Sequence, residues 1–416
     1  MIEIGKYSFG TGDRFARQGA AQLKATIQAE ATGLRLSHIW NKSFREHKTV
    51  HSDPASVREE ADSAVAELGW QGQYFVDADH INLNNVEAFI PHSDFFTIDV
   101  AEYIGQRPGD TELGQFMSDF GNRPSALTID GIELPMPITQ DWLGQFASQF
   151  LSPIEAAGKV YRHIAAQKGH DNFVVEVSMD EVDEPQSPME LYFILGGLAR
   201  EGVPVQTIAP RFTGRFNKGV DYVGNPDKFA LEFEQSLYVI RAAIADFGLP
   251  ANLKLSLHSG SDKFSIYKPI NRLLKKHGAG LHVKTAGTTW LEEIGGLAQA
   301  GGSGLEFAKS IYVKALERYD ELTAPYRTVI DIHPEKLPSA EMVKGWTPWQ
   351  FSGALRHEPG SPLFSSEFRQ LMHVAYKIAA EAGRSFYREI DNHRDLIAGN
   401  VTFNLLERHI KPIFIG

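Results

Sequence analysis

The stretch FVDADHINL, residues 75–83, begins as an apolar strand and then places two acids and a histidine within four positions. A short apolar run bounded by polar residues predicts a buried β-strand. Ionisable residues at the carboxyl end of such a strand are typical of parallel sheets whose strand-to-helix loops carry an active site. If further strands end in the same way, the ionisable residues at their carboxyl ends would together form a candidate site.

Seven other short apolar segments also predict strands. They are KYSFGTG (6–12), DFFTIDV (94–100), NFVVEVS (172–178), VPVQTIA (203–209), LKLSLHSG (253–260), LHVKTAG (281–287) and TVIDIHP (328–334). Amphipathic segments of helical length, such as 226–248, lie between several of them, which is typical of repeated βα units. With QYFVDAD (73–79), eight units favour a TIM-type (β/α)8 barrel over an open doubly wound sheet.

Two regions do not fit a simple repeat of βα units. Residues 126–138, ALTIDGIELPMPI, place Asp-Gly between apolar runs, which predicts an inserted hairpin, and residues 140–169 predict a long helix after it. The segments 365–383 and 404–414 also predict helices, which would either cap the barrel or form an oligomer contact. We therefore expect a barrel over 1–338 with an insertion at about 101–170, and a helical extension over 339–416.

Composition excludes several classes of function. The 416 residues include no cysteine, so disulfides, thiolate metal ligands and a cysteine nucleophile are excluded. A net charge of -11 and the lack of a basic run argue against nucleic-acid binding. Neither an export signal nor a long apolar stretch is present, so we expect a soluble, cytoplasmic protein.

Ionisable residues gather at the predicted strand ends. The set is Asp77, Asp79, His80, Glu176, His258, His282, Lys284, Asp331 and His333. A single histidine at such a place is more often structural, but several at one rim would suit zinc, manganese, cobalt or nickel. His333 precedes Pro334 and equally fits a strand terminator, so it is held in reserve. The remaining candidates are predicted on solvated faces: His51, His163, His277, His357 and His409.

Four motifs together resemble one known family. They are SFGTGDRFARQGAAQL (8–23), DADHINL (77–83), LHSGSDKFSIY (257–267) and HVKTAGTTWLEE (282–293), and the likeness spans most of the chain. This combination is similar to the tagaturonate epimerases, also called tagaturonate/fructuronate epimerases. The resemblance implies a metal-dependent enzyme of hexuronate catabolism that interconverts D-tagaturonate and D-fructuronate. Related members accept fructose and tagatose, so the preferred sugar stays open.

The implied reaction constrains the chemistry. Numbered from the carboxylate, the ketone is C5 and the inverted centre is C3, whose C–H is not adjacent to the carbonyl and is not usefully acidic. A metal-assisted retro-aldol avoids this difficulty, because a base removes the C3 hydroxyl proton, the C3–C4 bond breaks, and the aldehyde recombines through its other face. Transient oxidation with hydride return is the other route, although no nicotinamide fingerprint is present.

The resemblance implies roles for the strand-end residues. By analogy with class II aldolases, which share an adjacent Asp-His pair, we expect His80, His258 and His282 to bind the metal. Asp79 is expected to transfer the proton at the C3 oxygen, and Glu176 to be a second acid/base. Since neighbouring strand residues face opposite sides, Asp79 and His80 can share a site only where the strand gives way to a loop.

Substrate contacts are less constrained by the sequence. The candidates for binding the substrate carboxylate are Arg14, Arg211, Lys263 and Lys284. Asp262 and Thr285 would bind hydroxyls or orient ligands. The loop 10–26 lacks the spacing of a dinucleotide fingerprint and the Lys-Ser/Thr of a P-loop, so Asp13 and Arg14 are predicted to contact substrate there.

Two other functions remain open at this level. A metal-dependent aldose–ketose isomerase on the same barrel would use similar rim residues but would move hydrogen between adjacent carbons. A non-catalytic sugar-binding protein would have no use for several converging histidines. In all three cases the partner is a small sugar or sugar acid.

Overall fold

The computed structural model describes residues 2–121, 125–180, 184–285 and 287–416. Its centre is a closed barrel of eight parallel strands, which confirms the predicted TIM-type fold. In chain order the barrel strands are β1 (Tyr7–Thr11), β2 (Ser37–Ser43), β3 (Tyr74–Ile81), β4 (Phe95–Asp99), β7 (Val174–Ser178), β8 (Thr207–Ala209), β9 (Lys254–Leu257) and β10 (Leu281–Lys284). Closure is made by β10, which pairs with β1 from Tyr7↔Leu281 to Gly10↔Lys284.

One predicted strand was wrong. Residues 328–333 contain no strand, and Gln370 bonds both the backbone N–H and the C=O of Asp331 in this loop. The missing barrel strand is β2, with the sequence SHIWNKS. Its polar residues hid it, because His38 and Lys42 are buried and hydrogen-bonded inside the molecule. Because this strand is absent, the prediction that Asp331 and His333 lie at the barrel rim is also wrong.

Helices surround the barrel. The outer ring contains α1 (Gly19–Glu30), α3 (Ala55–Leu68), α5 (Gln140–Lys168), α6 (Pro188–Arg200), α7 (Pro226–Phe247), α8 (Phe264–His277) and α9 (Thr288–Ala300). The chain ends in a π-helical segment, η5 (Asn404–Ile415), which packs against both α8 and α1. The last residues of the chain therefore complete the barrel wall.

Local sequence explains the best-defined ring helix. α7 begins after Asn225, whose side chain accepts hydrogen bonds from the N–H groups of Asp227 and Lys228. Pro226 stands in its first turn, where a missing N–H costs nothing. Gly248 ends it with a φ of 65°, in the left-handed region that favours glycine. The predicted helix over 226–248 is confirmed.

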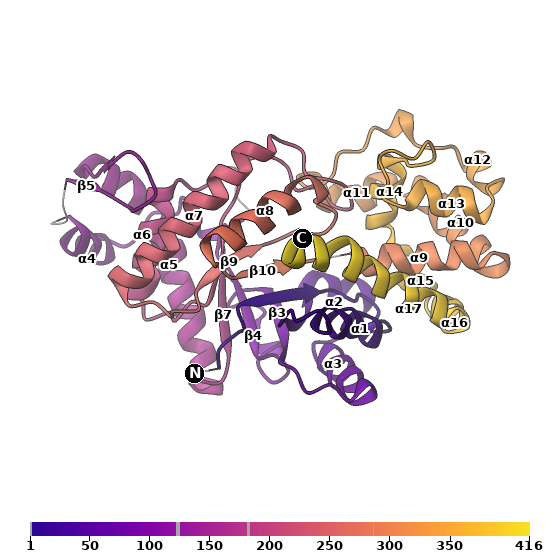
Figure 1. Ribbon diagram of the computed structural model, residues 1–416, viewed down its shortest axis with the longest axis horizontal. Coiled ribbons are helices and arrows are strands. Elements are labelled where there is room, and N and C mark those ends of the chain that lie inside the picture. The colour runs from indigo at the N-terminus through magenta and orange to yellow at the C-terminus, as the bar shows by residue number, and fades with distance from the viewer. Residues whose placement is uncertain (1, 122–124, 181–183, 286) are drawn as a thin grey trace.

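The insertion and the extension lie on opposite sides of the barrel (Figure 1). The insertion contains η2 (Ala101–Tyr103), α4 (Asp110–Phe120) and the short antiparallel pair β5 (Ala126–Leu127) and β6 (Met136–Pro137), which confirms the hairpin. We refer to all helices after α9 as the extension; before residue 339, where the sequence predicts its start, it contains α10 (Gly302–Glu317), α11 (Tyr319–Thr323), η3 (Ala324–Tyr326) and η4 (Pro334–Lys336). It continues through α12 (Ala340–Lys344), α13 (Pro348–Leu355), α14 (Ser366–Val374), α15 (Tyr376–Ala382), α16 (Arg384–Asn392) and α17 (Arg394–Phe403).

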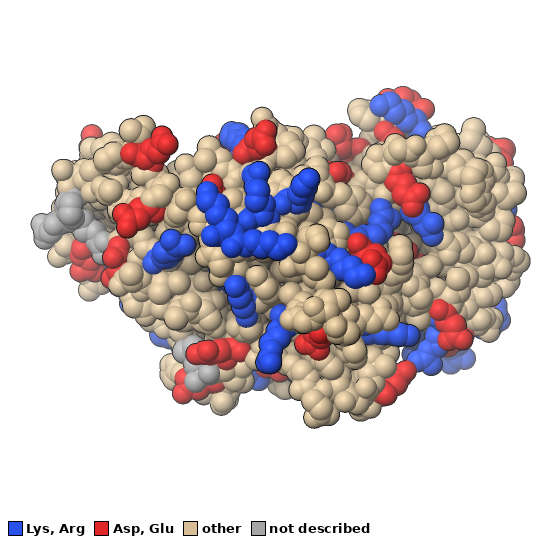
Figure 2. Space-filling view, in the orientation of Figure 1, with Lys and Arg blue, Asp and Glu red and all other residues tan. Residues whose placement is uncertain are grey.

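The surface carries charge unevenly. Figure 2 shows Lys and Arg side chains gathered in the middle of one face, over α8, which contributes Lys268, Arg272, Lys275 and Lys276. This patch is local, since the chain as a whole has a net charge of -11. Within the described residues, no helix has both the length and the apolar character needed to cross a membrane.

Candidate active site

The end of β3 is bent so that two neighbouring side chains face one site. His80 has a φ of 54°, and the pairing of β3 with β4 shifts register between Ala78 and Ile81. A left-handed residue breaks the alternation of a strand, so His80 turns to the side of Asp79. Their side chains meet, with Nδ1 of His80 2.9 Å from Oδ1 of Asp79. This irregularity is what allows the neighbouring residues Asp79 and His80 to face the same site.

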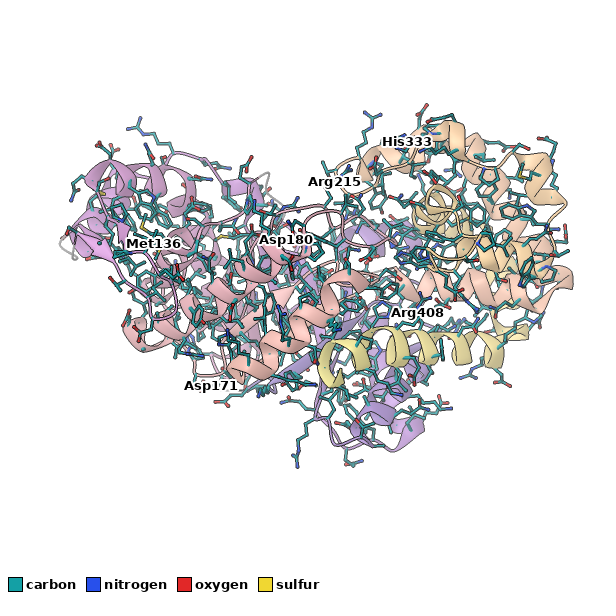
Figure 3. All side chains as sticks on the ribbon, turned by 45° about the horizontal axis from the view of Figure 1, so that its top comes forward. Met136, Asp171, Asp180, Arg215, His333 and Arg408 are labelled. Carbon is teal, nitrogen blue, oxygen red and sulfur yellow. The ribbon has the colours of Figure 1, made fainter. Side chains whose placement is uncertain are left out.

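A histidine and an acid from two other strand ends approach the same place. His258 follows β9 directly, and its Nδ1 lies 3.1 Å from Oδ1 of Asp180, which follows β7. The Nε2 of His80 lies 3.9 Å from the same oxygen. One possible ligand atom from each of these three residues lies within 4.8 Å of the others. Figure 3 labels Asp180 in the middle of the molecule, between the insertion and the extension.

Each imidazole is held by a carboxylate on its other nitrogen. Asp79 bonds Nδ1 of His80, and Glu176 lies 2.6 Å from Nε2 of His258. Such carboxylate–histidine pairs orient the rings in metal sites and fix which nitrogen faces the ion. The contacts of Glu176, which is fully buried, favour an orienting role. Its predicted role as a second acid/base stays a prediction.

Charge around these histidines is strongly coupled. Burial lowers the pKa of His258, but Asp180 and Glu176 outweigh it and raise that pKa to about 9. The pKa of His80 likewise lies well above its usual value, because Asp79 and Asp180 overcome the effect of burial. Burial would raise the pKa of Asp180, yet the two imidazoles hold it well below its usual range. Asp180 therefore favours the protonated form of both imidazoles.

Lys284 is surrounded by three carboxylates. Its Nζ lies 2.6 Å from Asp77, 2.8 Å from Asp79 and 3.1 Å from Glu176. Burial would lower the pKa of Lys284, but these acids raise it well above its usual value. Burial raises the pKa of Asp77 to about 7, although Lys284 opposes the rise. The pKa of Asp79 stays well below its usual range, because Lys284 and His80 outweigh the effect of burial.

His282 lies one layer deeper than the other two histidines. Its backbone pairs with Ser8 and Ser256, while Lys284 occupies the next inward position toward the rim. The side chain is fully buried, with Nδ1 3.0 Å from Ser8 Oγ, and its Nε2 has no hydrogen-bond partner among the described residues. Burial lowers the pKa of His282 to about 3. The structure does not place it in the group of His80, Asp180 and His258, and its predicted role as a ligand stays a prediction.

The N-terminal loop binds its own acid. The carboxylate of Asp13 accepts hydrogen bonds from four successive backbone N–H groups, residues 15–18. These donors form the cradle that an anion would need. Arg14 is buried as well, where it donates to Glu46 and to the C=O of His373 and lies over the ring of Tyr376. Its guanidinium is thus bound within the protein, although Arg14 borders a cavity.

The other predicted substrate residues have different surroundings. Asp262 is fully buried and pairs with Arg369 at 3.0 Å and with His357 at 3.3 Å. Lys263 donates to the C=O groups of Asn217, Val220 and Ser261. The hydroxyl of Thr285 donates to Gly10. Arg211 borders a cavity that is also lined by Asp180 and His258.

Two histidines predicted on solvated faces are buried instead. His357 and His409 are 2% and 0% exposed, and both lie beside Asp262. Charged neighbours in sequence, Arg356 and Glu358 beside His357 and Arg408 beside His409, concealed their burial. His51 is exposed, whereas His163 is half-buried beside Glu87 and His277 is half-buried beside Glu234.

Two cavities meet at the histidine group. The first, about 450 Å³, is lined by Asp79, His80 and Lys284. The second, about 510 Å³, is lined by Arg211, Phe212 and Arg215 on the loop after β8. Both are lined by Arg45, Asp180, Lys218, His258, Ser259 and Tyr326. A ligand beside Asp180 and His258 therefore has room on both sides.

Comparison with known proteins places this arrangement in a family. The family model for tagaturonate epimerase, UxaE, matches residues 1–409. The chain belongs to the tagaturonate epimerase family. It is accordingly an epimerase, which makes it an isomerase by reaction class. A tagaturonate/fructuronate epimerase from Thermotoga maritima is 27% identical over 423 residues, covering 97% of this chain and 79% of that protein.

Solved structures of a tagaturonate epimerase share the fold. The native fructuronate-tagaturonate epimerase UxaE from Cohnella laeviribosi matches with a TM-score of 0.75 and 22% identity over 98% of this chain and 82% of that chain. Its complex with two glycerol molecules matches with a TM-score of 0.77 and 23% identity, over 99% and 82%.

Asp180 is a residue of the candidate site that sequence reasoning missed. Residues 176, 178 and 180 share one face of an extended chain, because successive side chains alternate. Glu176 was recognised near the end of its predicted strand. Counting alternate residues from Glu176 along the same face leads to Asp180. The segment VVEVSMD therefore held the signal.

Proposed function

We propose that this chain interconverts D-tagaturonate and D-fructuronate by metal-assisted retro-aldol and aldol steps. The observation that carries the proposal is the grouping of His80, Asp180 and His258 beside the ionised carboxylate of Asp79. Family membership supports the reaction, and the printed activity of the Thermotoga maritima relative supports the substrate pair.

The donor set fits a divalent cation. Two imidazole nitrogens and a carboxylate oxygen are ligands that zinc, manganese, cobalt and nickel accept. Two protonated rings beside Asp180 carry together the charge of one divalent ion, so an ion would replace two protons at the same carboxylate. Bound there, the ion would polarise the substrate ketone and stabilise the negative charge that develops when the carbon–carbon bond breaks.

Asp79 is placed to move the proton. It lines the first cavity next to His80 and is ionised, so it can accept the C3 hydroxyl proton. The electron pair of that O–H bond then forms the C3 carbonyl, and the pair of the C3–C4 bond moves into the C4–C5 enediolate. After the aldehyde turns, C4 attacks its other face, and Asp79 returns the proton to the new C3 oxygen. Atoms and electrons balance without an oxidant.

Lys284 argues against an imine route. A Schiff base needs a neutral amine, and such lysines are usually desolvated without nearby acids. Lys284 instead contacts three carboxylates and remains an ammonium. Its charge keeps Asp79 ionised when the imidazoles lose their protons.

The test is carbon NMR of the purified chain, with and without added divalent metal, on tagaturonate and on fructose. We expect metal-dependent formation of the C3 epimer of tagaturonate, with loss of turnover in Asp180→Asn and His258→Ala. Metal binding by calorimetry should weaken in both variants. His163→Ala, at a half-buried histidine that borders neither cavity, is the matched control and should bind metal normally. An aldose product would instead support the aldose–ketose isomerase, and absence of metal binding with absence of turnover would refute the proposal.

A further inference from the structure

One buried side chain at the first cavity lacks a hydrogen-bond partner. Asn41 is 2% exposed, and its Oδ1 accepts no hydrogen bond from any of the described residues. A buried acceptor without a partner is unfavourable, and in a native protein it needs an explanation. Among the described residues that have such a buried, unpartnered polar atom, only Asn41 lines either of the two cavities at the histidine group. A molecule bound in the first cavity can therefore complete the hydrogen bonding of Asn41.

Asn41 points into the barrel from β2. His38, which lies three positions earlier, is hydrogen-bonded to Thr26 of α1 and so faces the helices. Because side chains alternate along a strand, Asn41 faces the opposite side. A Cβ atom on Gly10 would lie 3.1 Å from Oδ1 of Asn41 and 3.4 Å from Cε1 of His282. The absence of a side chain at Gly10 thus leaves the space that the carboxamide occupies.

The strand order places Asn41 beside the proton-transfer group and away from the candidate metal ligands. Asn41 pairs in register with Asp77, and Ser43, the next residue on the inward face, pairs with Asp79. The candidate metal ligands come from the end of β3 and from the chain just after β7 and β9. In the barrel, β3 and β4 separate β2 from β7. A substrate with its ketone at the metal ligands and its C3 oxygen at Asp79 then extends toward β2.

The proposed reaction needs a contact on the aldehyde fragment. When the C3–C4 bond breaks, C4–C6 keep the ketone oxygen, and C1–C3 become a separate aldehyde. This aldehyde must turn about its C2–C3 bond to present its other face, so the C3 oxygen cannot be its fixed contact. The hydroxyl on C2 keeps its place during the turn. A carboxamide accepts a hydrogen bond from such a hydroxyl, and it does not compete with Asp79 for the proton because it does not titrate.

We propose that Asn41 accepts a hydrogen bond from the C2 hydroxyl of the substrate and holds the aldehyde fragment while its C3 end turns. This inference rests on the proposed function, because it assigns a further contact to the same reaction. The contact raises the affinity for sugars that carry this hydroxyl. It also lets the aldehyde recombine before it leaves the cavity.

The experiment combines a change in the residue with a change in the sugar. Steady-state kinetics are measured for the wild type, Asn41→Ala and the similarly shaped Asn41→Leu, with tagaturonate and with its 2-deoxy analogue, numbered from the carboxylate. With tagaturonate, kcat/KM should fall about fivefold to a hundredfold in both variants. The analogue should lower the wild-type value by a similar factor. With the analogue, both variants should stay within twofold of the wild type, because the partner of Asn41 is already missing.

Asn404→Ala is the matched control. Asn404 is also 2% exposed and has the same unpartnered Oδ1, but it lines neither cavity. This variant should match the wild-type kinetics with both sugars. If Asn404→Ala reproduced the pattern expected for Asn41→Ala, the pattern would not depend on the cavity, and the inference would be overturned.

Two further measurements separate a substrate contact from a packing role. NMR should show more three-carbon products for each epimerisation event in Asn41→Ala than in the wild type, because the aldehyde escapes more often. The thermal midpoint of Asn41→Ala should not fall, since the acceptor that it removes has no partner in the free protein. A lowered midpoint with equal losses for both sugars would show a packing role and overturn the inference.

The outcomes also distinguish this inference from the proposed function. If the wild type converts tagaturonate and neither Asn41 variant loses activity, the contact is refuted and the proposed function stands. Losses from the variant and from the analogue that multiply would likewise refute the contact. An unchanged yield of three-carbon products would refute the holding of the aldehyde. Conversion of neither tagaturonate nor fructose by the metal-supplied wild type refutes the proposed function itself.

Discussion

Two buried clusters at the carboxyl ends of the barrel strands use acids in different ways. Around Lys284, three carboxylates share one ammonium, and Asp79 and Lys284 border a cavity. Around Asp262, one carboxylate has a guanidinium, an imidazole and, through its backbone N–H, a second imidazole as partners. Asp262 borders none of the cavities described above. The first cluster has excess acid facing open space, and the second is balanced and closed.

This difference distinguishes residues that can take part in a reaction from residues that stabilise the fold. A buried charge whose partners are complete stabilises one conformation, and a buried charge that faces a cavity is available to a ligand. The Asp262 cluster joins the loop after β9 to residues of the extension, namely His357, Arg369 and His409. His258 begins that loop, so the contacts of Asp262 with the extension fix the loop that carries this candidate metal ligand. The comparison predicts activity effects in the first cluster and stability effects in the second.

The largest effect is expected for Asp79→Asn. An amide cannot accept the C3 hydroxyl proton, so kcat should fall about 10²–10⁴-fold. Asp77 and Glu176 still neutralise Lys284, so the thermal midpoint should change little. Kinetics by NMR and calorimetric unfolding on the same sample test both statements. Retention of wild-type kcat would remove Asp79 from the mechanism.

Arg369→Met should reverse that pattern. It leaves Asp262 buried with only His357 beside its carboxylate, and breaking a buried pair costs about 3–5 kcal/mol of unfolding free energy. Urea unfolding measures the loss. Arg318→Met is the control, because its pairing with Glu321 and Glu381 is exposed and such pairs are worth about 0–1 kcal/mol. Equal effects in the two variants would contradict the contrast between closed and exposed pairs.

His409 makes the closed cluster sensitive to acid. Its Nε2 accepts a hydrogen bond from the N–H of Asp262, which requires a neutral ring, and burial lowers the pKa of His409 to about 4. The neighbouring charges oppose each other, because Asp262 raises that pKa while Arg408 and Arg369 lower it. The unfolded chain binds the proton near pH 6.5 and the folded chain does not. Stability should therefore fall as pH drops from about 6.5 to 4, by up to about 3 kcal/mol.

His409→Gln tests this assignment, because glutamine can accept the same hydrogen bond and does not titrate. Urea unfolding between pH 7 and 4.5 should show a shallower loss of stability in the variant than in the wild type. His163→Gln, at a half-buried histidine of α5, should keep the wild-type dependence. Parallel curves for wild type and His409→Gln would assign the acid sensitivity to other groups.

The fold was accessible to sequence reasoning where local patterns are strong. Short apolar strands and helix caps such as Asn225 are visible in a window of a few residues. β2 was missed because its polar residues are satisfied by distant partners, for example His38 by Thr11 and Thr26. Residues 328–334 were misassigned because an apolar run looks the same whether it pairs in a sheet or packs in a loop.

Part of the candidate site could also be predicted from local sequence patterns. Asp79, His80 and His258 stand at strand ends, where their types and positions predict function. The carbonyl groups that accept hydrogen bonds from Arg14 and Lys263 belong to residues far along the chain, such as His373 and Asn217, and no local pattern reveals them. Asn41 lies on β2, which was not predicted as a strand, so its place at the first cavity was not predicted either.

The smallest effect is expected for His333→Ala. Sequence position alone made His333 a reserve ligand, but its side chain is 52% exposed and has only a 3.7 Å approach to Glu335. In Figure 3 it lies on the extension, away from Asp180. Metal affinity by calorimetry and kcat should both stay within twofold of wild type, whereas His258→Ala should lose both. A tenfold loss of metal affinity in His333→Ala would place the metal outside the group of His80, Asp180 and His258. The cluster around Lys284 would then no longer be distinguished from the Asp262 cluster by a neighbouring metal site.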